Sequence, residues 1–305
     1  MKPLTYQCLQ MVLQEMSFMK RKELYAKCPA IRKQEERIGY RVNEMSVSQT
    51  STHCWIDVDN IETEINDCPE DKTKKCGVIM TNGKTGATVK QSIDVDPVEA
   101  AEKWITYILN RLNTRIQLFY LIQSPICLLK CDHPITIINL TMYVRSEVPE
   151  DSGRSSWLQT TVPVRHLTTD RVFRDDTMKT ARSVKIIQDD NIDGKILSEW
   201  QAIKISTDQP IPLEQIVIYC TGIAESGRPI GFRCESYIKF LNMEHSTLDW
   251  LAKKANARKT SWNGRKCFTI SLNNASELNV HGNLDNRSNC LIIEVNEKGT
   301  AIDRR

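Results

Sequence analysis

Metal-binding side chains come close together at one place in the sequence, in the spacing Cys127-x3-Cys131-x-His133. Structural zinc sites usually combine two short pairs of cysteine or histidine ligands, and no second pair stands at a matching distance from this group. Leucine and isoleucine side chains flank it, which suits reduced thiols in an apolar core. We therefore expect the protein to bind no metal and no other cofactor.

The stretch GVIMTNGKT, at residues 77–85, has part of the spacing of a phosphate-binding loop. Such a loop needs glycine five residues before its Gly-Lys pair, and Val78 occupies that position. A side chain there would stop the backbone amides from curling around a phosphate. Asn82-Gly83 is a strong turn signal, so the stretch predicts a β-hairpin over residues 78–93.

Residues suited to acid–base or nucleophilic catalysis occur without a recognisable arrangement. The five histidines are isolated, and neither a G-x-S-x-G nor an H-E-x-x-H signature is present. The acidic pairs Asp175-Asp176 and Asp189-Asp190 stand at turn or cap positions. These observations favour a non-catalytic protein. An enzyme or small-molecule binder stays open as the alternative, because a site can be assembled from distant residues.

Composition and charge narrow the function classes further. The chain has 305 residues, of which 40% are hydrophobic and 26% charged, as in globular proteins. Its net charge of +3 is too small to indicate nucleic-acid binding. We find no signal peptide and no apolar run long enough to span a membrane. Eleven cysteines without a framework favour a reducing, intracellular location in the cytoplasm or nucleus.

The N-terminal 40 residues are expected to be helical and carry a net charge of +4. Leu9, Val12, Leu13 and Met16 have the spacing of one helix face, over residues 3–16. A second helix would follow Ser17. A third would follow Pro29, with its charged residues, Glu35 among them, on the outward face.

Alternating patterns predict strands from residue 41 onward, one of them over residues 54–65. Asp96-Pro97-Val98-Glu99 has the pattern of a helix start, which predicts a helix over 97–112. Trp104, Ile108 and Leu112 would lie on its buried stripe. A further helix is expected over 246–255, followed by a turn at Asn263-Gly264.

Residues 180–220 contain three segments of the form φ-x-x-φ-x-φ, where φ is apolar, beginning at residues 181, 200 and 213. Each is expected to be a strand followed by a polar turn, as in leucine-rich repeats. Their spacings of 19 and 13 residues are irregular. The predicted fold is α/β, a short helical N-terminal segment followed by a mixed or parallel strand–helix domain with irregular leucine-rich-like units. Expected domains are 1–40, 41–150 and 151–305, with a boundary loop at 147–156.

The opening, KPLTYQCLQMVLQEM followed by KRKELYAKCPAIRKQEERI, resembles that of a nematode-expanded family of uncharacterised proteins with a degenerate F-box-like N-terminus. The likeness continues in MKTARSVKII, EWQAIKI and CLIIEVNEKG, as in the family's F-box-associated-type C-terminal region. An F-box docks on the linker subunit of cullin-type ubiquitin ligases, and the following domain holds a target protein. The resemblance therefore implies a substrate adapter.

Position by position, the resemblance implies that partner-binding residues lie on the first two helices. F-boxes typically open with Leu-Pro, whereas this chain has the reverse order. The same apolar residues could instead close the protein's own core, and both interpretations stay open. The implied docking residues are Pro3, Leu4, Leu9, Val12, Leu13 and Leu24.

Overall fold

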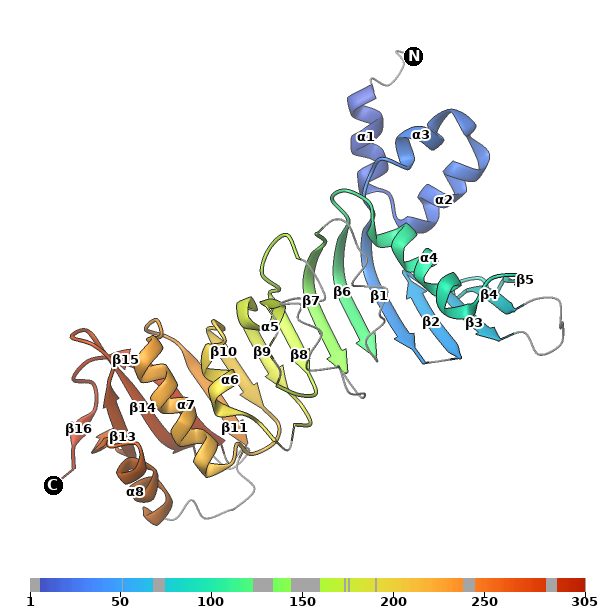
Figure 1. The fold of residues 1–305 in the computed structure, drawn as a ribbon. Coiled ribbons are helices and arrows are strands. Elements are labelled where there is room, and N and C mark those ends of the chain that lie inside the picture. Colours follow the sequence, from blue (N-terminus) through green and yellow to red (C-terminus); the bar gives the residue numbers. More distant parts are fainter. Residues whose placement is uncertain are drawn as a thin grey trace. The chain divides into compact units, whose positions relative to one another are not determined.

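The computed structural model describes residues 6–50, 52–67, 75–122, 134–143, 160–172, 174, 176–189, 191–237, 245–283 and 290–304. The chain forms two compact units, Met1–Arg165 and His166–Arg305. Both combine helices with sheet, which confirms the predicted α/β class and the helical start of the chain (Figure 1). The expected boundary loop at 147–156 lies outside the described residues.

The first unit contains one sheet with the strand order β7-β6-β1-β2-β3-β4-β5. Strands β1, β6 and β7 are parallel, and β1 to β5 form an antiparallel meander. Its helices are α1 (Tyr6–Glu15), α2 (Phe18–Lys27), the 3-10 turn η1 (Pro29–Ile31), α3 (Arg32–Glu35) and α4 (Pro97–Leu109). Its strands are β1 (Arg41–Gln49), β2 (His53–Val58), β3 (Ile61–Asp67), β4 (Cys76–Asn82), β5 (Thr88–Ile93), β6 (Arg115–Ile122) and β7 (Thr136–Tyr143).

Two hairpins in this meander test the turn predictions. The hairpin at Asn82-Gly83 is confirmed, since β4 and β5 pair on either side of it. The single strand expected over 54–65 is wrong, because β2 and β3 pair across a two-residue turn. Asp59 and Asn60 form that turn with φ angles of 50° and 80°. Short polar side chains tolerate this left-handed conformation, which tight hairpins need.

Helix α4 begins as predicted, with the Asp96 side chain accepting hydrogen bonds from the amides of Val98 and Glu99. It ends at Leu109, three residues earlier than predicted, and Leu112 is exposed instead of buried. Ile108 is buried as expected, whereas Trp104 is only half-buried. Helix α4 packs across β2, β3 and β4 on one face of the sheet (Figure 1).

The second unit contains a sheet with the order β16-β12-β13-β14-β15-β11-β10-β9-β8. Strands β8 to β11 are parallel, and α6 and α7 pack together (Figure 1). The elements are β8 (His166–Thr169), α5 (Asp176–Thr180), β9 (Ser183–Ile186), α6 (Gly194–Glu199), β10 (Lys204–Thr207), α7 (Leu213–Ser226), β11 (Arg233–Tyr237), α8 (His245–Lys254), β12 (Arg258–Trp262), β13 (Arg265–Ser271), β14 (Ser276–Asn283), β15 (Cys290–Glu297) and β16 (Ile302–Asp303).

Predictions for the second unit are confirmed for α8 and for the Asn263-Gly264 turn, which joins β12 to β13. Of the three φ-x-x-φ-x-φ segments, the first is confirmed as β9, where Ala181, Val184 and Ile186 are buried. In the second, which was expected at Trp200, Ile203 and Ile205, Ile203 is exposed. The buried triplet of that strand lies two residues later, at Ala202, Ile205 and Thr207. The third is wrong, because residues 213–226 form helix α7. The i, i+3 spacing at its start belongs to helices as well as to this strand pattern.

The same buried spacing recurs on several of the parallel strands, but not on β11, where Gly231 is exposed and Phe232, Cys234 and Ser236 are buried. In the first unit it occupies β1, β6 and β7, and in the second β9 and β10. Alternation along a strand places the last two positions of each triplet on the same face. The register skips one residue between the first two positions in β1, β6 and β7, and all three positions are buried there. The buried triplets are Val42, Met45, Val47; Ile116, Phe119, Leu121; Ile137, Leu140, Met142; Ala181, Val184, Ile186; and Ala202, Ile205, Thr207.

The burial of β10 can be tested with two isoleucines, Ile205 within the strand and Ile203 directly before its first residue. Ile205 is completely buried, whereas Ile203 is 53% exposed. We expect Ile205→Ala to lower the free energy of unfolding by about 2–5 kcal/mol, because it leaves a cavity in the core. Ile203→Ala should change it by less than about 0.5 kcal/mol. Denaturant unfolding of both variants measures this, and equal losses would contradict the difference in burial.

Candidate partner-binding surface

The predicted docking residues on the first two helices do not form one surface. Leu13 is completely buried and belongs to the protein's own core, while Leu9 and Leu24 are half-buried. Val12, on the other side of α1, is 48% exposed, and its neighbour Met11, which the sequence did not single out, is 67% exposed. Pro3 and Leu4 lie outside the described residues. Helix α1 therefore buries one face and presents Met11 and Val12 on the other.

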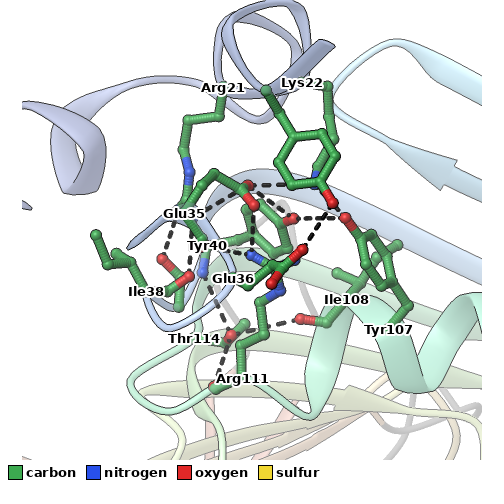
Figure 2. Close-up of polar contacts among 12 residues, drawn as sticks. Arg21, Lys22, Glu35, Glu36, Ile38, Tyr40, Tyr107, Ile108, Arg111 and Thr114 are labelled. Atoms are coloured by element: carbon green, nitrogen blue, oxygen red, sulfur yellow. Dashed lines mark hydrogen bonds and ion pairs between the residues drawn. The ribbon is translucent and has the colours of Figure 1, made fainter. Parts of the chain in front are cut away.

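The position of α2 and α3 depends on a buried carboxylate, Glu35, at the end of α3 (Figure 2). Its Oε1 atom lies 3.3 Å from Arg21 Nη2 and 3.2 Å from Lys22 Nζ, both on α2. Its Oε2 atom accepts a hydrogen bond of 3.0 Å from Arg111, which follows α4. One carboxylate thus ties α2 and α3 to the segment that leads into β6.

Arg21 is buried on all sides and is satisfied mainly by backbone carbonyl groups. It donates to the carbonyl oxygens of Gly39 at 2.7 Å, Ile38 at 2.8 Å and Glu35 at 3.0 Å. The chain at Gly39 lies so close to residues 112–114 that a Cβ atom would sit 2.4 Å from their backbone. Only glycine permits this approach. The end of the helical segment is therefore fixed against the α4–β6 connection.

The ring of Tyr40 lies between two guanidinium groups. Arg21 and Arg111 are 4.3 Å and 4.4 Å from its centroid, within the range of cation–π attraction. The Tyr40 hydroxyl donates to Glu35 at 3.0 Å and also contacts the hydroxyl of Tyr107 on α4. Phe18 of α2 packs on Tyr40 edge to face, with centroids 4.8 Å apart. Aromatic packing and charge thus act on the same residue.

We call this group the Glu35 cluster (Arg21, Lys22, Glu35, Tyr40, Tyr107 and Arg111), and its environment shifts the pKa of Glu35 and of Tyr40. Burial opposes ionisation of Glu35, but the Arg111 hydrogen bond and the surrounding cations outweigh it and lower the pKa of the carboxyl group. Burial raises the pKa of Tyr40 far above its ordinary value, so its hydroxyl stays protonated. An ionised, buried carboxylate paired with cations suits the positioning of helices and not proton transfer.

Sequence patterns misplaced Glu35, which was expected on the outward face of the third helix and is buried. The local charge pattern could not reveal this, because Arg111 lies 76 residues further along the chain. The excess of basic residues among the first 40 could have indicated that a carboxylate is buried between them. Part of it, at Arg21 and Lys22, surrounds Glu35 and is not available to a partner.

A pocket of about 370 Å³ lies in the first unit between α4 and the β3–β5 hairpins. Its lining is almost entirely apolar, and the half-buried Trp104 belongs to it. The ionisable groups in its wall are Lys103 and Tyr107. The lining residues are Thr63, Ile65, Val78, Met80, Ile93, Val95, Ala100, Lys103, Trp104 and Tyr107.

The second unit brings a thiol, an imidazole and a carboxylate onto neighbouring strands. Cys267 lies opposite His281 in register, and His281 Nε2 is 3.3 Å from Glu294 Oε1. Burial raises the pKa of the Cys267 thiol, which keeps it protonated and a poor nucleophile. Glu294 is also paired with Arg233 at 3.0 Å. This group resembles a buried structural network more than a nucleophilic site.

Metal and membrane expectations can be compared with the described part of the chain alone. No cluster of three or more metal-binding side chains occurs there, and none of its helices is long and apolar enough to cross a membrane. The group Cys127, Cys131 and His133 lies outside the described residues. The expectation that no metal binds there stays a prediction.

The Glu35 cluster makes stability depend on pH in a defined direction. Since the folded-state pKa of Glu35 is lowered, its contribution is present above the ordinary pKa of 4.5 and is lost as the pH falls below it. We expect Glu35→Gln to lower the free energy of unfolding by about 3–5 kcal/mol at neutral pH, because three cations lose their anion. It should also weaken the acid dependence that denaturant unfolding detects between about pH 5 and pH 3.

The neighbouring Glu36 supplies a matched control. It is exposed and accepts a hydrogen bond only from Tyr25 among the contacts described, at 2.7 Å. Glu36→Gln should change the free energy of unfolding by less than about 0.5 kcal/mol and leave the acid dependence intact. Equal behaviour of the two variants would show that Glu35 has no special role.

Comparison with known proteins adds no relative from which a role could be transferred. No family model matches the chain, and no curated protein or solved structure matches it either. The functional argument therefore depends on the chain's own surfaces. These are the exposed side of α1, the helices α2 and α3 that the Glu35 cluster holds in place, and the apolar pocket beneath α4.

Proposed function

We propose that the protein is a non-catalytic interaction protein, an F-box-like substrate adapter of a ubiquitin ligase that acts inside the cell. One observation supports this most: α1 presents the apolar side chains of Met11 and Val12 to solvent while its opposite face buries Leu13. Apolar anchors on a preorganised support are what protein partners bind most tightly. The proposed partner of this surface is the ligase linker subunit.

Contacts hold α1 and the helices that follow it to the first unit. The Glu35 cluster fixes α2 and α3 to the strand domain, and Leu13 anchors α1 through its buried face. Glu15 near the end of α1 also contacts Arg41 at the start of β1. A docking helix held in this way pays little ordering entropy when a partner binds.

We further propose that the parallel strands are irregular leucine-rich-like units that hold a target protein. Within the second unit, the register partners Leu167, Val184, Ile205 and Cys234 are 17, 21 and 29 residues apart. Two of these distances fall within the 20–29 residues of leucine-rich repeats, and the first is slightly shorter. The uneven lengths explain why the pattern is weak in the sequence.

Small-molecule binding is the second candidate function. The pocket beneath α4 favours it, because a concave apolar space of this size is typical of ligand sites. Its wall lacks an arrangement of groups for acid–base catalysis among the residues described, so we propose at most the binding of an apolar ligand there. Adapter and ligand-binding roles are separable, since the pocket and the exposed side of α1 use different residues.

Docking through α1 is tested by the double substitution Met11→Asp with Val12→Asp. Both side chains are exposed, so the variant should unfold within about 0.5 kcal/mol of the wild type. It should bind purified linker subunit at least about tenfold more weakly, because two apolar anchors become charged. Calorimetric titration of the full chain with the linker subunit measures the affinity.

Two further variants make the outcome decisive. Ile203→Asp places a charge at an equally exposed apolar position in the second unit and should leave the affinity unchanged. Leu13→Asp should unfold the helical segment, since that side chain is buried. A wild-type chain that fails to bind the linker subunit, or a double variant that binds it normally, would refute the adapter proposal.

A further inference from the structure

One face of the first unit's sheet carries no helix among the residues described. Helix α4 covers the opposite face, where Ile65 and Val78 line the apolar pocket together with residues of α4. On the open face, the side chain of Trp55 in β2 is 47% exposed. An exposed tryptophan on a strand is unusual for a surface that only meets water, since indole rings are enriched where proteins bind partners.

Four carboxylates lie on this open face, on three adjacent strands. Ser46 of β1, Asp57 of β2 and Glu62 of β3 are consecutive partners in register, and Trp55 is the partner of Glu64. Glu44 precedes Ser46 by two residues and is exposed. We call this surface the acidic face and define it by Glu44, Trp55, Asp57, Glu62 and Glu64.

These carboxylates lack basic partners in the described part of the chain. Glu64 has a histidine, His53, at 4.0 Å and an asparagine hydrogen bond, but none of the four forms an ion pair with lysine or arginine. Burial raises the pKa of Asp57, and the neighbouring carboxylates of Glu62 and Glu44 raise it further. Among the described residues, no lysine or arginine pairs with the negative charge of these four carboxylates. The whole protein has a net charge of +3, so this negative charge is a local feature of the face.

The tryptophan and the carboxylates are held in a fixed arrangement. The indole Nε1–H of Trp55 donates to Asp57 Oδ1 at 3.1 Å, and the hydroxyl of Ser46 donates to Asp57 Oδ2 at 3.3 Å. Asp57 thereby orients the indole ring beside the exposed carboxylates of Glu62 and Glu64. Lysine and arginine side chains bind carboxylates and also stack on indole rings, so both parts of the surface favour the same ligand chemistry.

We propose that the acidic face binds a lysine- and arginine-rich segment of a partner protein. The inference extends the proposed adapter function, in which such a segment belongs to the target. Carboxylates of the face pair with the basic side chains, and the ring of Trp55 stacks on one of them. Ile79 is the register partner of both Glu64 and Lys90, so Lys90 lies on β5, two strands from Glu64 towards the sheet edge. Its positive charge repels a basic segment and so limits the binding surface on that side.

Fluorescence anisotropy with a labelled arginine- and lysine-rich peptide tests the proposal on the full chain. The wild type should bind the peptide, and more weakly as salt is added, because the pairs are exposed. Glu62→Gln with Glu64→Gln should weaken binding about tenfold through the lost charge pairs. Trp55→Ala should weaken it about fivefold without changing the charge, which separates a built site from general attraction to negative charge.

Glu99→Gln is the matched control, since Glu99 lies on α4, over the other face, and pairs with Lys103. It should leave peptide affinity unchanged, and thermal melting should show that all variants are folded. No binding by the wild type, or equal loss in the control, would overturn the acidic-face proposal. Linker-subunit binding is measured separately, so this inference can fail while docking through α1 stands, and the reverse.

Discussion

The carboxylate of Glu35 lies buried among Arg21, Lys22 and Arg111, and the position of the N-terminal helices depends on it. Removing charges from water is costly, so such a cluster contributes less to net stability than to the choice of one arrangement. Backbone carbonyl groups around Arg21 lower that cost by hydrogen bonding. The cluster thus determines where the segment lies, and apolar contacts of Phe18 and Leu13 supply the burial that holds it.

The sequence predicts those features correctly that depend on residues close together in the chain. The Asp96 cap, the turn at Asn263-Gly264 and the α/β class all follow from neighbouring residues. The strand predicted at the start of α7 is wrong, because the spacing of Leu213 and Ile216 fits a helix and a strand pattern equally well. The buried state of Glu35 could not be predicted, since its partner Arg111 is distant in sequence and only the fold brings them together.

Both proposed binding surfaces of the first unit use residues that alternate with core positions. On α1, Leu13 faces inward and Val12 outward. On β2, Ile56 is buried, whereas Trp55 and Asp57 lie on the open face. The core positions fix the backbone, so the outward side chains can differ without loss of the fold. Both proposed surfaces therefore consist of residues that the hydrophobic pattern leaves unspecified.

The long sequence separation between Glu35 and Arg111 has a consequence for how the chain folds during synthesis. The ribosome releases the N-terminal end first, yet α2 and α3 cannot be locked in place until Arg111 has emerged and β6 can pair with β1. Contacts of such high contact order form late. The helices α2 and α3 can therefore reach their native position only after the chain has been made as far as β6, about 80 residues beyond them.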